Sequence, residues 1–174
     1  MDTLRSLWKV AVAGGAGLAV MELVRRAAAP WIKQKQAEPM DVFATARSMS
    51  LVGVHHRPDE SATDAIGRLA YEKVTGEEPT PATKHDLSWA VHIGYGLLVT
   101  ALFMTVWRHP RVLRDGFWFG AGLWLIGDEL VVPLLGLADK PTAYHPSRHA
   151  QSFAQHIGFG VTTAAATRAL EALS

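Results

Sequence analysis

The chain of 174 residues contains no cysteine, and its net charge is only +1. The absence of cysteine excludes disulfides and thiolate metal sites. A charge so close to zero argues against nucleic-acid binding, which needs a basic face. The sequence also lacks a Walker loop, a nucleotide fingerprint after a strand, an HExxH motif and a GxSxG motif. The sequence therefore gives no indication of the nucleotide-binding or hydrolase activities that these motifs mark in soluble enzymes.

Formal charge is also missing from one long segment, residues 87–107. Its length meets the ~20 residues that a helix needs to cross a bilayer. Trp89 and Trp107 flank it, as aromatic residues do at membrane interfaces. Three further segments are mainly apolar: 10–32, 116–138 and 150–170. We therefore expect an all-α protein, a four-helix transmembrane bundle in contact with the lipid bilayer that forms one integral-membrane domain over residues 1–174.

Basic residues next to these segments predict their orientation. Arg5 and Lys9 precede the first apolar segment, and Arg108, Arg111 and Arg114 lie between the second and the third. Positively charged residues in short flanks stay on the cytoplasmic side. We therefore expect both termini and the short loop between the second and third segments to face the cytoplasm.

The connection between the first two expected spans, residues 33–86, is long and would face outward. Ser61 followed by Asp64 has the pattern of a capping box, and Gly76 is a stop signal, so a helix is expected between them. A second short amphipathic helix is expected over residues 40–49. The connection should thus be partly folded.

One sequence segment occurs twice. Residues 84–96 and 148–160 share seven of thirteen positions. Such self-similarity predicts two repeated helical hairpins related by an approximate symmetry axis. Small residues let helices approach closely. The candidate helix-packing glycines are Gly15, Gly17, Gly94, Gly96, Gly120, Gly122, Gly158 and Gly160.

Ionisable residues inside the expected spans are candidate functional groups, because they are costly in a membrane. His92 and His156 begin the returning helices, at the depth reached by Glu22 and by Asp128 or Glu129. If the glycine segments 15–18 and 120–123 correspond, Glu22 and Glu129 cannot both face the bundle centre, because two residues turn a helix by about 200°. The choice between Asp128 and Glu129 stays open. Arg25 and Arg26 favour the opposite orientation of the first span, but Glu22, three and four residues earlier, can neutralise part of their charge.

Several interpretations of this layer compete. The histidines and carboxylates could ligate a non-haem metal ion, or His92 and His156 could be axial ligands of one haem b, with glycines giving the ring room. They could instead form hydrogen bonds that hold helices together, or line a proton or solute pathway in an oligomeric transporter. Further histidines are expected at the outer mouth of the bundle: His85, His145 and His149. His55 and His56 are expected in a solvated loop.

The second half of the chain resembles the YagU-like family of small, uncharacterised bacterial inner-membrane proteins. The glycine-rich segment 116–122, the helix end 132–137, Pro141 and the segment 155–158 carry the resemblance. It implies an integral protein of the cytoplasmic membrane and no established catalytic site. We expect a structural or accessory membrane subunit that associates with itself or with a larger complex.

Overall fold

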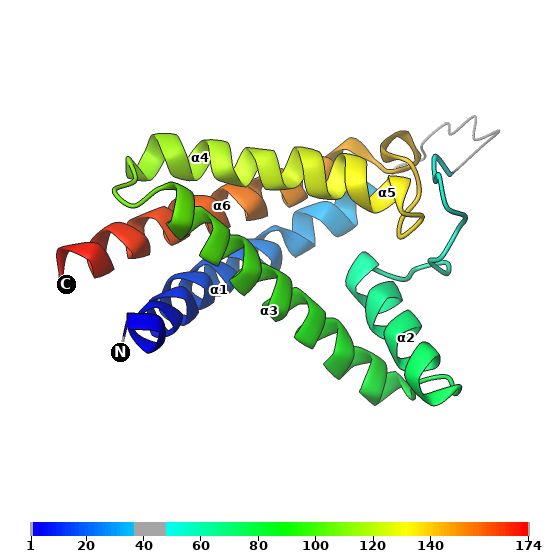
Figure 1. The fold of residues 1–174 in the computed structure, drawn as a ribbon. Helices are drawn as coiled ribbons and strands as arrows, with labels where there is room; N and C mark the ends of the chain where they lie inside the picture. The colour runs from blue at the N-terminus through cyan, green and yellow to red at the C-terminus, as the bar shows by residue number, and fades with distance from the viewer. Residues whose placement is uncertain (1, 37–47, 174) are drawn as a thin grey trace. The chain divides into compact units, whose positions relative to one another are not determined.

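The computed structural model describes residues 2–36 and 48–173, with side chains from 7–33 and 48–173. This part of the chain is helical and contains no strand (Figure 1). Its elements are α1 (Asp2–Gln36), α2 (Ala62–Thr75), α3 (Pro81–Val106), α4 (Val112–Gly122), the π-helix η1 (Leu123–Val131), α5 (Val132–Leu134), the 3₁₀ helix η2 (Pro141–Ala143) and α6 (Pro146–Ala172). The expected all-α class is confirmed.

Three of these helical stretches are long and apolar enough to cross a membrane: Leu7–Lys33, Pro81–Val106 and Val112–Leu134. They correspond to the first three expected spans, and this is the make-up of an integral membrane protein. The fourth expected span, 150–170, lies within α6, which has the required length but carries more polar residues. The four-span bundle and its repeated hairpins therefore stay predictions.

Helix α3 begins at Pro81, six residues before the apolar segment that predicts it. Proline suits the first turn of a helix because its missing N–H has no partner there. The Thr80 hydroxyl accepts a hydrogen bond from the Thr83 N–H at 3.2 Å and so caps this end. Apolar length thus located the span, while local capping extends the helix into polar sequence.

The third span changes its winding along its length. The α-helical turns of α4 give way to the nine-residue π-helix η1, followed by the single turn α5. The helical run ends at Leu134, and Gly136 adopts a left-handed conformation with φ 68°. The expected end at residue 138 was therefore too late, because this glycine turns the chain earlier.

The helix expected between Ser61 and Gly76 is confirmed as α2. The Ser61 side chain accepts a bond from the Asp64 N–H, the Asp64 carboxylate accepts one from the Ser61 N–H, and Gly76 ends the helix at φ 75°. The other expected helix of this connection, over residues 40–49, falls mostly on residues 40–47, which lie outside the described part of the chain.

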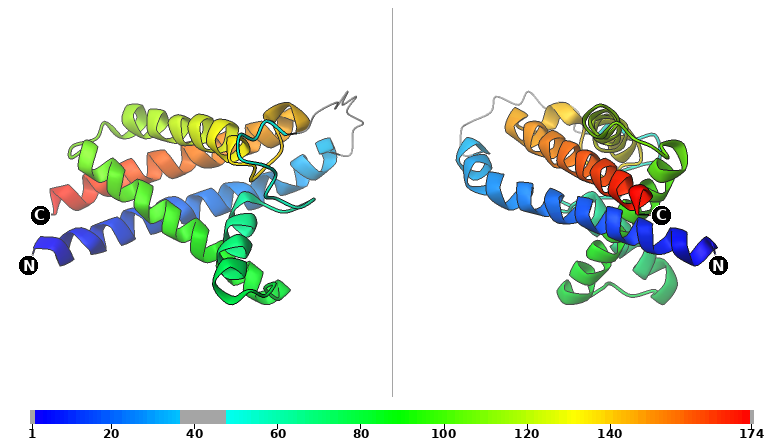
Figure 2. Two further views of the ribbon diagram at one scale, coloured as in Figure 1. Left: turned by 45° about the vertical axis from the view of Figure 1, so that its right-hand side comes forward. Right: turned by 90° about the vertical axis from the view of Figure 1, so that its left-hand side faces the viewer.

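The chain forms two compact units, and α3 and η1 each pass from one unit into the other. Unit 1 comprises residues 1–41, 96–125 and 145–174. In it α6 packs against both α1 and α4 and runs antiparallel to each (Figures 1 and 2). Lys9 at the start of α1 pairs with Glu171 at the end of α6 at 3.8 Å, which fixes the antiparallel direction.

Aromatic side chains form the core of unit 1. The ring of Phe103 in α3 lies 4.7 Å from that of Phe119 in α4, and Phe119 lies 6.1 Å from Phe159 in α6. Phe103 is fully buried, and Phe159 is nearly so. The three rings hold α3, α4 and α6 together through apolar contact.

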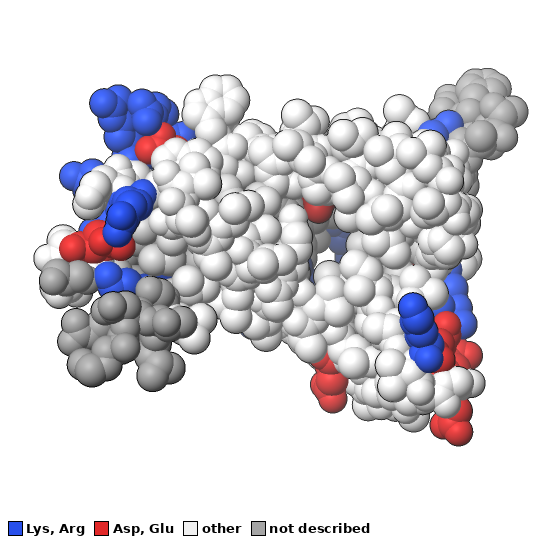
Figure 3. All heavy atoms as spheres, viewed as in Figure 1, with Lys and Arg blue, Asp and Glu red and all other residues white. Residues whose placement is uncertain are grey.

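A group of basic side chains lies at one end of unit 1. In Figure 3, Lys and Arg atoms gather where the loop between α3 and α4 lies, and the surface along α4 is uncharged. The start of α1 and the end of α6 lie at this same end of the unit (Figure 2).

Unit 2 comprises residues 42–95 and 126–144. In it α2 packs closely on the first turns of α3. A Cβ on Gly67 would lie 2.9 Å from the Cβ of Leu87, so glycine lets the helices meet there. The Thr63 and Ser88 hydroxyls are hydrogen-bonded at 2.8 Å, which adds a polar contact to the same interface.

Candidate functional site

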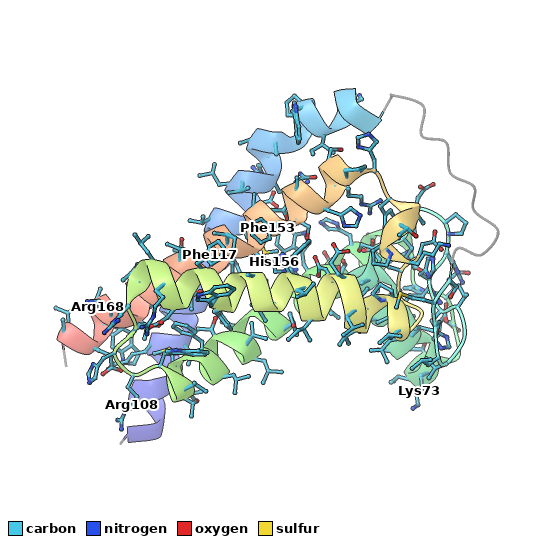
Figure 4. The ribbon with its side chains drawn as sticks, turned by 90° about the horizontal axis from the view of Figure 1, so that it is seen from above. Lys73, Arg108, Phe117, Phe153, His156 and Arg168 are labelled. Atoms are coloured by element: carbon cyan, nitrogen blue, oxygen red, sulfur yellow. The ribbon has the colours of Figure 1, made fainter. Side chains whose placement is uncertain are left out.

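His156, a candidate ligand in α6, lies at the closest crossing of unit 1. Its side chain is buried, and its Nδ1 is 2.9 Å from the Ser152 carbonyl one turn earlier in the same helix. That oxygen is an acceptor, so Nδ1 carries the proton in this bond. Figure 4 shows His156 beside Phe117 and Phe153, between α4 and α6. The imidazole therefore forms a hydrogen bond within its own helix.

The backbone of His156 is packed just as closely. A Cβ on Gly120 of α4 would overlap the His156 carbonyl, and a Cβ on Gly160 would overlap the Gly116 carbonyl. Backbones that meet this closely leave no room for a further group between α4 and α6.

Most of the predicted helix-packing glycines face neighbouring helices of unit 1. Gly17 faces Phe159 and Thr163, Gly96 faces Leu18, and Gly158 faces Val20. The remaining three meet no atom within 4 Å that an added Cβ would touch: Gly15, Gly94 and Gly122. The eight glycines therefore divide into a packed set and an open set.

Glu22, in α1, is held by its own helix. Arg25 donates to both carboxylate oxygens at 2.6 and 2.7 Å, and Arg26 donates to one of them at 2.6 Å. This agrees with the neutralisation expected from the spacing of three and four residues. Both oxygens of the candidate metal ligand are thus engaged by guanidinium groups.

His92, Asp128 and Glu129 belong to unit 2. The His92 ring lies edge-on to Trp89, with centroids 6.0 Å apart, and Trp89 in turn meets His85 at 6.4 Å. Asp128 and Glu129 lie in η1. Within the part of the chain that the structure describes, no three His, Asp or Glu side chains are placed to hold a metal ion.

Because Asp128 and Glu129 lie in a π-helix, the side-chain directions expected for them no longer apply. Their expected directions assumed α-helical winding, whereas η1 has more residues per turn because its hydrogen bonds run from i to i+5. Pro133 has no N–H, so it can serve neither the Glu129 carbonyl in an α ladder nor the Asp128 carbonyl in a π ladder. The end of η1 just before this proline follows from that missing donor.

The expected outer-mouth histidines have different surroundings. His145 precedes α6, and its Nδ1 accepts a bond from the Ser147 N–H at 3.2 Å, so it caps the helix. His85 contacts Trp89, and His149 lies in the first turns of α6. His145 is therefore the N-cap of α6, a role that its position before Pro146 could have indicated.

A charged cluster in unit 2 was missed from the sequence. Glu60 accepts bonds from Arg68 Nε and Nη2, both at 2.9 Å, and Lys84 Nζ lies 2.7 Å away. The Glu60 and Arg68 side chains are only 1% and 5% exposed. The signal was Arg68 itself, which shares a helical face with Ala65, because an arginine on a buried face needs a partner.

Electrostatics of this cluster favour the ionised forms. Burial alone would raise the pKa of Glu60, but hydrogen bonds from Arg68 and Lys84 outweigh it and lower that pKa to about 2. The hydrogen bond to Glu60 in turn raises the pKa of Arg68. The cluster is a closed ion-pair network that joins α2, α3 and the segment before α2.

His56 is also less solvated than expected. Its side chain is 12% exposed, its Nδ1 donates to the Gly136 carbonyl at 2.9 Å, and its Nε2 lies 3.4 Å from Asp139. The segment before α2 is thereby attached to the end of the third span. Sequence spacing gives no sign of this contact, which joins residues 80 positions apart.

Comparison with known proteins adds no relative to this description. No protein-family model, no curated protein and no solved structure matches the chain.

Proposed function

We propose that this chain is a four-span protein of the bacterial inner membrane, similar to the YagU-like proteins, that serves as a structural or accessory subunit. The observation that carries the proposal is the place of α6 between α1 and α4. A helix in contact with lipid must be apolar on all exposed sides, whereas a helix covered on two sides can keep polar residues.

The buried residues of α6 fit this position. They include four polar ones, Ser147, His156, Thr163 and Thr167, together with Phe159 and Ala164. The polar residues that weaken α6 as a membrane span are thus partly those that face other helices. With α6 as a fourth span, the start of α1 and the end of α6 would share the cytoplasmic side with the basic loop between α3 and α4.

Helix packing supports a structural role more than a cofactor role. His156 bonds its own helix, Glu22 bonds two arginines, and the α4–α6 crossing is closed by glycines. These polar groups are engaged within their own helices, and the close α4–α6 contact leaves no room for a cofactor at this crossing.

The open glycines indicate how such a subunit would bind. Gly15 and Gly122, in unit 1, have no atom within 4 Å of an added Cβ. Small residues on an exposed face of a membrane helix allow another helix to approach closely. We therefore place a contact with a second copy or with another membrane subunit on these faces.

The test is the size of the complex after mild detergent extraction. The wild-type chain should migrate as an assembly larger than one protomer, and Gly15→Leu with Gly122→Leu should reduce that size without lowering the melting temperature. Gly120→Leu is the matched variant at a packed glycine and should destabilise the protomer itself. If the wild-type chain migrates as a monomer and shows a Soret band or a stoichiometric metal, the proposal is overturned in favour of the cofactor alternative.

A further inference from the structure

The segment between Ser50 and His56, here called the apolar loop, exposes hydrophobic side chains. Leu51, Val52 and Val54 are 80%, 57% and 59% exposed. A loop in water normally presents polar side chains and bonds its backbone to solvent. This one has the opposite character.

The apolar loop is attached to the end of the third span, within unit 2. The Leu51 N–H donates to the Leu134 carbonyl at 2.9 Å, and the N–H groups of His55 and His56 donate to the Gly136 carbonyl at 2.8 and 3.1 Å. The loop is therefore fixed where this candidate membrane helix stops.

The loop also satisfies polar groups within itself. The Ser50 hydroxyl donates to the Gly53 carbonyl at 2.6 Å and accepts from the Val52 N–H at 3.1 Å. His55 Nε2 lies 3.1 Å from the Val52 carbonyl. These backbone groups find partners in the protein, which irregular backbone requires where water is scarce.

We propose that the apolar loop inserts Leu51, Val52 and Val54 into the interfacial region of the lipid bilayer beside the end of the third span. The span itself presents apolar side chains near the attachment point: Leu130, Val131 and Leu135 are 46%, 41% and 45% exposed. Leu51 is hydrogen-bonded to the residue just before Leu135, so the loop extends this apolar surface. The insertion rests on the proposed membrane-spanning function.

Placement of the loop can be measured by fluorescence quenching, because the chain has no native cysteine. Val52→Cys is labelled with an environment-sensitive fluorophore and reconstituted in phosphatidylcholine vesicles with or without brominated acyl chains. Leu102→Cys, at an exposed position in the apolar second half of α3, is the lipid control. Val74→Cys, also exposed but beside Lys73 on α2, is the water control.

We expect brominated lipid to quench the Val52→Cys probe nearly as strongly as the Leu102→Cys probe, and iodide to quench it several-fold less than the Val74→Cys probe. Val54→Cys should behave like Val52→Cys. Full iodide access at both loop positions, with Leu102→Cys still quenched by lipid, would overturn the insertion alone. Protection from both quenchers would also overturn it and indicate a protein partner. Loss of lipid quenching at Leu102→Cys would instead refute the spanning helices.

Discussion

Gly120 sets the distance between α4 and α6, since its missing side chain is what admits the His156 carbonyl. Gly120→Ala should therefore lower the free energy of unfolding by about 1–3 kcal/mol, the usual cost of overpacking. Gly122→Ala, two residues later, meets no atom within 4 Å and should be neutral or stabilise by up to about 1 kcal/mol through helix propensity. Thermal unfolding in one detergent compares the two variants. Equal melting temperatures would contradict the close crossing.

Glu60 should make stability depend on pH in acid. Its pKa in the folded chain is about 2, below the ordinary value of 4.5. Its stabilising effect is therefore fully present above about pH 4.5 and is lost as the pH falls toward 2. Glu60→Gln should remove that dependence and, by leaving Arg68 and Lys84 without their shared partner, cost about 3–5 kcal/mol at neutral pH.

The control for Glu60 is Glu78→Gln, since Glu78 pairs with Arg57 at an exposed position. Exposed ion pairs contribute little, so this variant should unfold like the wild type. The free energy of unfolding is measured between pH 7 and pH 2 for the wild type, Glu60→Gln and Glu78→Gln. A Glu60→Gln chain with the wild-type acid profile would show that the buried network does not carry the dependence.

At the scale of elements, the turn at Gly136 joins the third span to the segment before α2. Gly136 and Gly76 both have positive φ, 68° and 75°, but only at Gly136 would a Cβ overlap another residue, the Gly53 carbonyl. Gly76→Ala should cost about 1 kcal/mol from backbone strain alone. Gly136→Ala should cost clearly more and should expose residues 50–56 to hydrogen exchange. Similar losses in both variants would contradict the attachment of this segment.

Local sequence signals predicted some elements well. Ser61, Asp64 and Gly76 define α2 because capping acts over three residues and needs no distant partner. The length of the apolar segments located three spans for the same reason. Winding was not predictable in this way: the π-helix over Leu123–Val131 depends on how the span is held, and the directions inferred for Asp128 and Glu129 from α-helical geometry lost their basis.

Contacts between distant parts of the chain account for what the sequence did not reveal about the candidate site. His92 and His156 occupy matching positions in the repeated segment, yet one contacts Trp89 and the other bonds Ser152. The Glu60–Arg68–Lys84 network and the His56–Gly136 bond also depend on tertiary packing. Residue type and spacing located ionisable groups, but only packing decides which of them face each other.

At the scale of the whole molecule, a four-span chain crosses the membrane an even number of times. The basic loop between α3 and α4 and both ends of unit 1 would then share the cytoplasmic side. Three spans would instead put the two termini on opposite sides. The position of the C-terminus therefore distinguishes a polar fourth span from a helix that stays at the surface.

The most direct measurement is the labelling of single cysteines by a membrane-impermeant maleimide in intact and lysed spheroplasts. The chosen variants are Asp2→Cys, Leu173→Cys and, as the outward-facing reference, Val74→Cys. We predict that intact spheroplasts label only Val74→Cys, and that Asp2→Cys and Leu173→Cys react after lysis. Labelling of Leu173→Cys in intact spheroplasts, with Asp2→Cys still protected, would contradict the fourth span.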